Sequence, residues 1–222
     1  MKAAVFVGKQ RLSVEEVPTP RPGPGQVLVK IKYCAICGSD VHRFQYGQMR
    51  EGAIMGHEFC GTIAEVGKGV TGWKEGDRAI GGGGTPPAGS PPDPTLAPRY
   101  SSKVLGFIPG GAPGGYAEYV AMDAWKPLPI PDNVSDELAA LTEPCSIALH
   151  AVRLSKLRLG DTAAILGAGP IGLLCLQVAK AAGAGDVYVS EPAPNRALAA
   201  ERFDAAKVFN PRNVDVVAEI VA

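Results

Sequence analysis

The sequence predicts two domains: an all-β domain built as a small barrel, then an α/β domain with a parallel sheet. Short runs of alternating apolar residues dominate the chain up to about residue 81, whereas strand-like and helix-like runs alternate from residue 161 onward. The 28 glycines and 20 prolines make about 22% of the 222 residues, against roughly 12% in average proteins. This favours a loop-rich fold over a helical bundle. We place the domains at 1–150 and 151–222.

The first domain is expected to consist of short strands with turns between them. A proline-rich stretch at 18–25 forbids regular helix and favours an exposed, polyproline-like connector. Many short strands at regular spacing are typical of a small barrel. The expected strands are 2–7, 13–17, 26–32, 59–66, 77–80 and 116–120.

The segment 81–115 differs in kind from its surroundings. Ten glycines and eight prolines fall among its 35 residues, a composition that cannot build a packed core. We expect a long surface lobe or flap. Composition alone supports an ordered functional loop and a disordered segment equally.

The second half of the chain reads first as helix and then as βαβ units. Ser135 is expected to cap a helix with Asp136 and Glu137 in its first turn, and Pro144 to interrupt that helix before a second one at 147–157. Alternation of strands with helices of about ten residues predicts a parallel sheet. The expected strands are 161–166, 186–189 and 207–209, and the expected helices are 171–182, 195–203 and 214 onward.

Overall charge and cysteine content exclude several classes of protein. Lys and Arg number 22, as do Asp and Glu, so no net charge favours nucleic acid or an anionic membrane as partner. No apolar run reaches the roughly 18 residues that span a bilayer. Five cysteines without a secretory signal argue against a disulfide framework. We therefore expect a cytoplasmic protein whose thiols are core residues or metal ligands.

A glycine-rich turn between an expected strand and an expected helix predicts a dinucleotide site. Residues 167–172 read Gly-Ala-Gly-Pro-Ile-Gly. In such a turn Gly167 permits the tight bend, Gly169 lets the backbone approach a pyrophosphate, and Gly172 allows close helix–strand contact. The helix N-terminus, where Ile171 lies, offers free N–H groups to the phosphates. The alternative is a glycine-rich turn of an ordinary α/β protein.

An acidic residue at the end of the next strand indicates which coenzyme the turn would take. Glu191 lies nineteen residues beyond Gly172. A carboxylate there accepts hydrogen bonds from the adenosine ribose and repels a 2′-phosphate, so NAD is favoured over NADP. Arg196 is a candidate contact at the adenosine end, and equally an exposed arginine at a helix start.

Two short motifs in the first domain predict a metal site. Residues 37–42 read Cys-Gly-Ser-Asp-Val-His, and 56–58 read Gly-His-Glu. Thiolate and imidazole suit zinc, so Cys37 and His57 with either Glu58 or Glu143 would supply three ligands and leave a fourth position open, as in catalytic zinc sites. Asp40 is a plausible acceptor for the other ring nitrogen of His57. From spacing alone, the Cys–His pair is equally typical of unrelated core residues.

Together with Gly-Gly-Tyr-Ala-Glu-Tyr-Val at 114–120 and Glu-Pro at 143–144, these motifs resemble zinc-dependent medium-chain alcohol dehydrogenases, most of all the sorbitol, threonine and butanediol dehydrogenase branch. The resemblance covers the whole chain in the correct order. It implies a GroES-like β-barrel catalytic domain followed by a partial Rossmann domain with a doubly wound parallel sheet.

The resemblance also implies an activity: hydride transfer from a secondary alcohol, of polyol or hydroxy-amino-acid type, to NAD. Cys37 and His57 would bind one catalytic zinc, with Glu58 and Glu143 as candidates for the third ligand. Zinc would lower the pKa of the alcohol, and the proton would leave through a relay that begins at Ser39 and ends at His42. The substrate would be a small molecule, and we keep a homo-oligomer open for the full-length protein.

Two departures from the family pattern shape the remaining expectations. The segment 81–115 contains no cysteine, so we expect no structural zinc there. Family members are longer than this chain by well over half, so we expect the chain to be a C-terminally truncated part of a longer dehydrogenase. Two alternatives stay open: a catalytically inactive fragment or binding protein that retains the fold, and a zinc hydrolase that binds no nucleotide.

Overall fold

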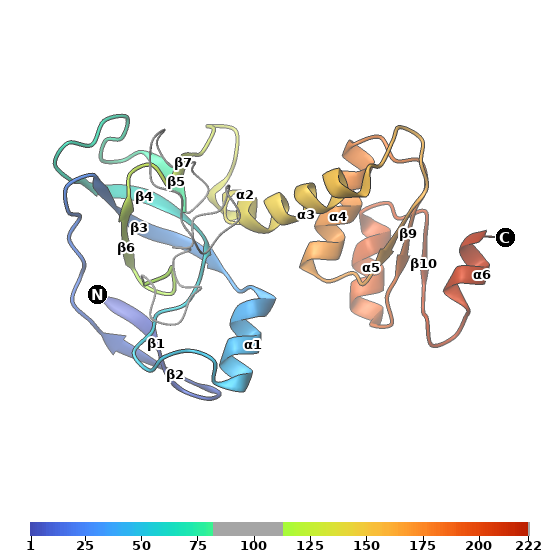
Figure 1. The fold of residues 1–222 in the computed structure, drawn as a ribbon, viewed down its shortest axis with the longest axis horizontal. Coiled ribbons are helices and arrows are strands. Elements are labelled where there is room, and N and C mark those ends of the chain that lie inside the picture. Colours follow the sequence, from blue (N-terminus) through green and yellow to red (C-terminus); the bar gives the residue numbers. More distant parts are fainter. Residues whose placement is uncertain (82–112, 222) are drawn as a thin grey trace. The chain divides into compact units, whose positions relative to one another are not determined.

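The computed structural model describes residues 1–81 and 113–221, which form two compact units, Met1–Glu143 and Pro144–Ala222 (Figure 1). The boundary lies inside a helix, slightly before the position expected from the sequence. Most of the glycine- and proline-rich segment, with its predicted lobe, lies outside the described residues. None of the described helices has the length and apolar character needed to cross a membrane.

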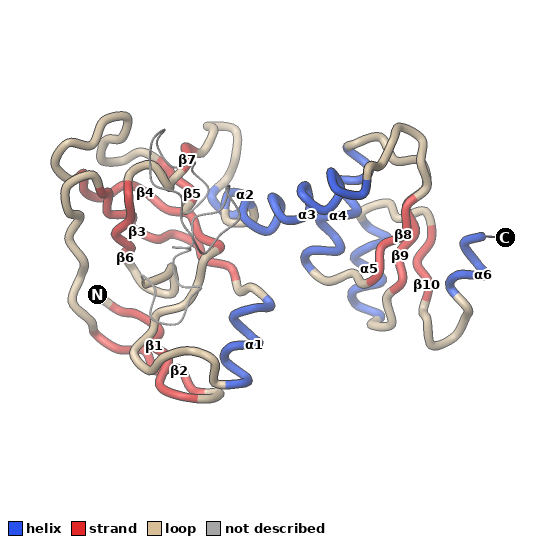
Figure 2. Tube along the Cα trace, viewed as in Figure 1, coloured by secondary structure: helices blue, strands red, loops and turns tan. Residues whose placement is uncertain are grey.

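The core of the first unit is an antiparallel sheet with the strand order β6-β3-β4-β5-β7 (Figure 2). Apolar residues gather in the first half of β3 and along β4, and alternate residues of a strand lie on the same face, so one face can pack a core. Val27, Val29 and Ile63 from this face are almost fully buried together with Phe59. The strands are β3 (Gln26–Ala35), β4 (Glu58–Val66), β5 (Arg78–Ile80), β6 (Tyr119–Asp123) and β7 (Leu128–Pro129).

The first two strands form a separate hairpin, β1 (Lys2–Gly8) with β2 (Arg11–Glu16). The hairpin is tied to the segment before β6, where the Ala4 N–H donates to the Tyr116 carbonyl at 2.8 Å. This explains why β6 begins later than expected. The expectation of a barrel needs correction in one respect: within the described part of this unit the strands form an open sheet and a hairpin, because β6 and β7 remain at opposite edges.

A helix that the sequence analysis did not predict follows β3. Helix α1 (Gly38–Tyr46) begins after Cys37, whose extended backbone makes it the N-cap residue, and ends at Gly47 in the left-handed conformation. Its glycine, serine and aspartate are weak helix formers in a helix interior, but they occupy the first turn, where such residues are tolerated. The metal-site motif of residues 37–42 is therefore a helix start.

Two helices follow β7 in the chain: α2 (Asp136–Ala139) and α3 (Thr142–Ser155). Ser135 caps α2 as predicted, its hydroxyl accepting the Leu138 N–H at 3.3 Å. The prediction that Pro144 breaks the helix is wrong. The break lies at residues 140–141, and Pro144 belongs to the first turn of α3, where a missing N–H costs no helical hydrogen bond.

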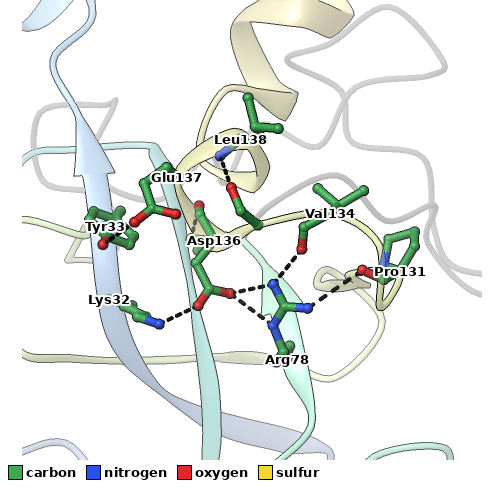
Figure 3. A network of polar contacts seen from close by, with 10 residues as sticks. Lys32, Tyr33, Arg78, Pro131, Val134, Asp136, Glu137 and Leu138 are labelled. Carbon is green, nitrogen blue, oxygen red and sulfur yellow. Dashed lines mark hydrogen bonds and ion pairs between the residues drawn. The ribbon is translucent and has the colours of Figure 1, made fainter.

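Helix α2 is fastened to the sheet by a polar network around Asp136 (Figure 3). The Asp136 carboxylate accepts from Arg78 Nε at 2.9 Å and is paired with Lys32. Next to it, the Tyr33 hydroxyl donates to Glu137. Because Lys32 and Tyr33 belong to β3 and Arg78 belongs to β5, one turn of helix is attached to two strands.

The second unit contains a parallel sheet in the order β10-β9-β8, with a helix in each crossover. This is the first half of a doubly wound sheet. Its core packs Leu176 and Ala179 from α4 against Val187 and Val189 from β9, with Ala200 from α5. The elements are β8 (Ala163–Leu166), α4 (Pro170–Ala181), β9 (Val187–Ser190), α5 (Pro194–Arg202), β10 (Lys207–Phe209) and α6 (Val216–Val221).

Candidate active site

Three potential metal ligands from distant parts of the sequence meet at one end of the β3–β4 pair. One ligand atom each from Cys37, His57 and Glu58 can be chosen so that all lie within 4.8 Å of one another. The antiparallel register pairs Ala35 with Glu58. Cys37, just past the end of β3, therefore lies beside the start of β4. His57 and Glu58 are only 5% and 6% exposed, so these two side chains are screened from bulk water, whereas Cys37 is partly exposed.

A glycine immediately before His57 lets an aromatic ring pack against the site. Gly56 has a positive φ of 94°, and a Cβ there would lie 2.6 Å from the Tyr116 ring and 2.8 Å from Cys34 Sγ. Real Cβ atoms do not approach other atoms so closely. A side chain at position 56 would displace Tyr116 or Cys34, so glycine is needed for both backbone conformation and space.

Asp40 connects the helix start, the tyrosine and the histidine. Its carboxylate is 2% exposed and accepts hydrogen bonds at Oδ2 from the Cys37 N–H at 3.1 Å and from the Tyr116 hydroxyl at 2.9 Å. The other oxygen, Oδ1, lies 3.7 Å from His57 Nδ1, a distance too long for a hydrogen bond. Asp40 is thus positioned to orient the imidazole, as a carboxylate next to a metal-binding histidine commonly does.

Tyr116 is a site residue that sequence reasoning missed. It stands in the Gly-Gly-Tyr motif at 114–116, but it comes from a segment 59 residues after His57, and nothing in its spacing indicates Asp40 as partner. Burial, followed by the negative charge of Asp40 and the hydrogen bond to it, raises the pKa of Tyr116 well above its usual range. The phenol therefore remains a hydrogen-bond donor to Asp40.

The electrostatics of the cluster favour a cation. Burial raises the pKa of Glu58, and Asp40 raises it further, whereas a hydrogen bond from Cys37 lowers it. The pKa of Glu143 is raised to about 6, first by burial and then by the charges of Glu58 and Asp40. Burial also lowers the pKa of His57, so its imidazole is neutral at pH 7 and can offer a lone pair. Asp40, Glu58 and Glu143 bring three carboxyl groups close together, and a divalent cation would reduce the repulsion between their negative charges.

The donor set fits zinc. Sulfur, imidazole nitrogen and carboxylate oxygen are the three ligand types that zinc uses in proteins, and three protein ligands leave one position open. Glu143, in the first turn of α3, is half-buried and close enough to Glu58 to shift its own pKa. It is not part of the set whose ligand atoms lie within 4.8 Å among the described residues.

The two residues predicted for proton relay lie three positions apart on α1, so they share one side of the helix. The Ser39 hydroxyl oxygen is buried and has no hydrogen-bond partner among the residues that the structure describes. His42 is exposed, and its ring lies against Tyr46 with centroids 4.5 Å apart. One group is therefore inside the protein and the other reaches solvent.

The glycine-rich turn of the second unit has the geometry expected of a phosphate-binding turn. Gly167 adopts a positive φ of 97°, and a Cβ on Gly172 would lie 1.9 Å from the Gly167 carbonyl oxygen, so neither position tolerates a side chain. Gly169 is the N-cap of α4, and Pro170 follows at the first helical position. Around Gly169 a Cβ would meet nothing within 4 Å, which leaves room for a ligand.

Glu191 follows β9 directly and lies beside this turn. Its Oε2 accepts the Ala168 N–H and its Oε1 accepts the Ala193 N–H, both at 2.8 Å. These hydrogen bonds lower the pKa of Glu191, and the nearby Arg196 lowers it further. Ile171 is 40% exposed in the first turn of α4, and Arg196 is exposed near the start of α5.

Comparisons with known proteins agree with both halves of this arrangement. Residues 23–132 match the family model of the alcohol dehydrogenase GroES-like domain, and residues 170–222 match that of zinc-binding dehydrogenases. The chain is 41% identical to (R,R)-butanediol dehydrogenase of Bacillus subtilis strain 168 over 99% of its own length and 66% of that protein. It is 37% identical to sorbitol dehydrogenase of the same strain, over 99% of the chain and 64% of the relative.

Solved structures show the same likeness. The crystal structure of the Bacillus subtilis butanediol dehydrogenase superposes with a TM-score of 0.86 at 39% identity, covering 99% of this chain and 66% of that one. The chain thus spans slightly less than two thirds of the length of these relatives. Family models in the correct order, identity above 35% and a shared fold lead to one conclusion: the chain belongs to the zinc-dependent medium-chain alcohol dehydrogenase family.

Proposed function

We propose that this chain carries the metal site and the coenzyme turn of a dehydrogenase that transfers a hydride from a secondary alcohol to NAD. The observation that supports it most directly is the convergence of Cys37 with the buried His57 and Glu58, whose ligand chemistry suits zinc. A glycine-rich turn with an acidic partner at Glu191 supplies the second requirement.

In this proposal Cys37, His57 and Glu58 hold the metal, and Glu143 is a further candidate carboxylate ligand. Zinc, when bound, acts as a Lewis acid that favours loss of a proton from an alcohol. Asp40 orients His57, and Tyr116 holds Asp40 in place. The buried Ser39 hydroxyl would accept the alcohol proton while giving up its own towards the exposed His42, whose imidazole would exchange a proton with water.

For the coenzyme we propose NAD rather than NADP. The Glu191 carboxylate lies against the turn, and its depressed pKa keeps it ionised at neutral pH. An ionised carboxylate accepts hydrogen bonds from the two ribose hydroxyls and repels a 2′-phosphate. Gly167, Gly169, Ile171 and Gly172 would cradle the pyrophosphate, and Arg196 would lie near the adenosine.

The substrate class follows from the named relatives. They are dehydrogenases of butanediol and sorbitol, both of which carry a secondary alcohol next to a second oxygen. We propose a polyol or a vicinal diol, with the hydroxy-amino acid expected from the sequence resemblance as the other candidate. A substituent oxygen beside the reacting alcohol would suit a site with carboxylate and metal groups.

The direct test is metal analysis of the purified chain combined with NADH formation from 2,3-butanediol, sorbitol and threonine. We expect about one zinc per chain, NADH formation with at least one of the alcohols, and loss of both on chelation. Cys37→Ser should lose zinc, whereas Cys175→Ser, with its sulfur in the second unit, should keep it. Zinc binding without NADH formation from any alcohol would contradict the activity, and absence of zinc would contradict the metal site.

A further inference from the structure

Glu191 makes contacts that recognition of a ribose does not require. Each of its carboxylate oxygens already accepts a backbone N–H, one from Ala168 and one from Ala193, both at 2.8 Å. The residue is only 4% exposed. Hydrogen bonds from backbone amides to an ionised carboxylate are among the stronger ones in proteins.

The two amides belong to the two segments that surround the coenzyme turn. Ala168 lies inside the turn, between Gly167 with its positive φ and Gly169 at the N-cap of α4. Ala193 is the N-cap residue of α5. One carboxylate therefore connects the loop after β8 to the loop after β9. Without it, the turn would rely on glycines, whose backbone is the most flexible of all residues.

We propose that Glu191 holds the glycine-rich turn in its binding conformation before any coenzyme arrives, in addition to accepting ribose hydroxyls. It is thus a positioning residue for the phosphates. The inference rests on the proposed coenzyme site. A carboxylate oxygen has two lone pairs, so each oxygen can keep its backbone N–H and still accept a hydroxyl. Ordering the turn in advance lowers the entropy that binding has to overcome.

The proposal has a consequence for coenzyme preference. Replacing the acid would remove the repulsion of a 2′-phosphate, but it would also loosen the turn that binds the phosphates of NAD and NADP alike. Glu191→Gln keeps size and shape, yet its amide nitrogen would face a backbone N–H, donor against donor. We therefore expect this variant to bind both coenzymes more weakly rather than to exchange one for the other.

The first test needs no ligand. In the unliganded full chain we expect slow hydrogen exchange at the Ala168 and Ala193 amides by NMR, and exchange about tenfold faster or more in Glu191→Gln, since a charge-assisted hydrogen bond is lost. Glu201→Gln, an exposed glutamate at the end of α5, is the matched control and should leave both amides unchanged. Fast exchange of both amides in the native chain, or equal rates in Glu191→Gln, would overturn the proposal.

The second test separates positioning from ribose recognition. ADP and 2′,3′-dideoxy-ADP share the phosphates, but only ADP has ribose hydroxyls. A residue that only binds the ribose would leave the dideoxy affinity unchanged in Glu191→Gln, whereas the proposal expects a loss of several-fold to about tenfold for both nucleotides. An unchanged dideoxy affinity overturns it. If the native chain binds neither nucleotide, the proposed coenzyme site fails, and the exchange measurement still decides the positioning role.

Discussion

At the scale of single residues, the glycine-rich turn of the second unit requires that residue 172 has no Cβ atom. Gly172→Ala would place a Cβ 1.9 Å from the Gly167 carbonyl oxygen. Although alanine is the better helix former, we expect the variant to lower the free energy of unfolding of this unit by about 1–3 kcal/mol, because the contact cannot relax without moving backbone. Urea denaturation followed by circular dichroism measures this loss.

Gly169→Ala is the matched control for that experiment. Gly169 has a negative φ, and a Cβ there meets no atom within 4 Å, so the free energy of unfolding should change little. Coenzyme binding should nevertheless weaken, since the added methyl occupies the space left for a pyrophosphate. Equal destabilisation by the two substitutions would contradict the assigned difference between the glycines.

A second residue-scale prediction concerns the hydroxyl of Tyr116. Tyr116→Phe removes one of the hydrogen bonds to the buried carboxylate of Asp40 and leaves the ring in place against Gly56. We expect the free energy of unfolding of the first unit to fall by about 1.5–3 kcal/mol, the usual range for a hydrogen bond to a charged group. Tyr46→Phe, whose side chain is exposed, serves as control in the same denaturation assay. A similar loss in both would contradict the role of Asp40.

At the scale of elements, ion pairs hold the short helix α2 against the sheet. Four residues cannot form a stable helix alone, so contacts of Asp136 with Arg78 and Lys32 fix it to the sheet. These partners lower the pKa of Asp136. A carboxylate with a depressed pKa stabilises the folded state above its unfolded pKa of about 3.9, and this stabilisation disappears as the pH falls through the lower folded value.

Asp136→Asn should therefore reduce the free energy of unfolding by about 1–2 kcal/mol at pH 7, a modest value because Lys32 is largely exposed. The difference from the native chain should begin to shrink as the pH falls below about 4 and vanish below the lowered pKa of Asp136 in the folded native chain, where both proteins carry a neutral group at this position. Denaturation curves at several pH values measure it, with Asp132→Asn, an exposed neighbour, as control. A difference independent of pH would exclude a role for the ion pairs.

Helix α1 shows what pattern reading of an element can miss. Gly38, Ser39 and Asp40 read as loop residues, and the sequence analysis placed no helix there. Asp40 accepts the N–H of Cys37 and so closes the first turn of the helix. A local side-chain hydrogen bond therefore stabilises the start of α1. A helix such as α4, in contrast, can be predicted from the regular spacing of its apolar residues.

At the scale of the whole molecule, zinc and the coenzyme are expected to stabilise different units. All three atoms of the candidate metal cluster belong to Met1–Glu143, and the glycine-rich turn belongs to Pro144–Ala222. Zinc at 100 times its dissociation constant would stabilise the state that binds it by about 2.7 kcal/mol. Zinc should therefore slow amide hydrogen exchange in β3 and β4 and leave β8 to β10 nearly unchanged.

Hydrogen exchange resolved by residue, with and without zinc, measures this prediction. Magnesium, which prefers oxygen ligands and octahedral geometry, is the control ion and should have little effect at the same concentration. ADP should produce the reverse pattern, with slower exchange around residues 167–172. Equal protection of both units by zinc would contradict a metal site confined to the first unit.

The sequence by itself determined the family, the two-part architecture and the residue types at the metal and coenzyme sites, because those depend on short motifs and on local periodicity. Only the tertiary structure decided that Glu58 rather than Glu143 joins Cys37 and His57 in the cluster of possible metal ligands. It also decided that the Tyr116 hydroxyl donates a hydrogen bond to Asp40 and that Glu191 connects two backbone segments. Such contacts join residues that are far apart along the chain, and distances of that kind arise from strand register and close packing, which no local pattern encodes.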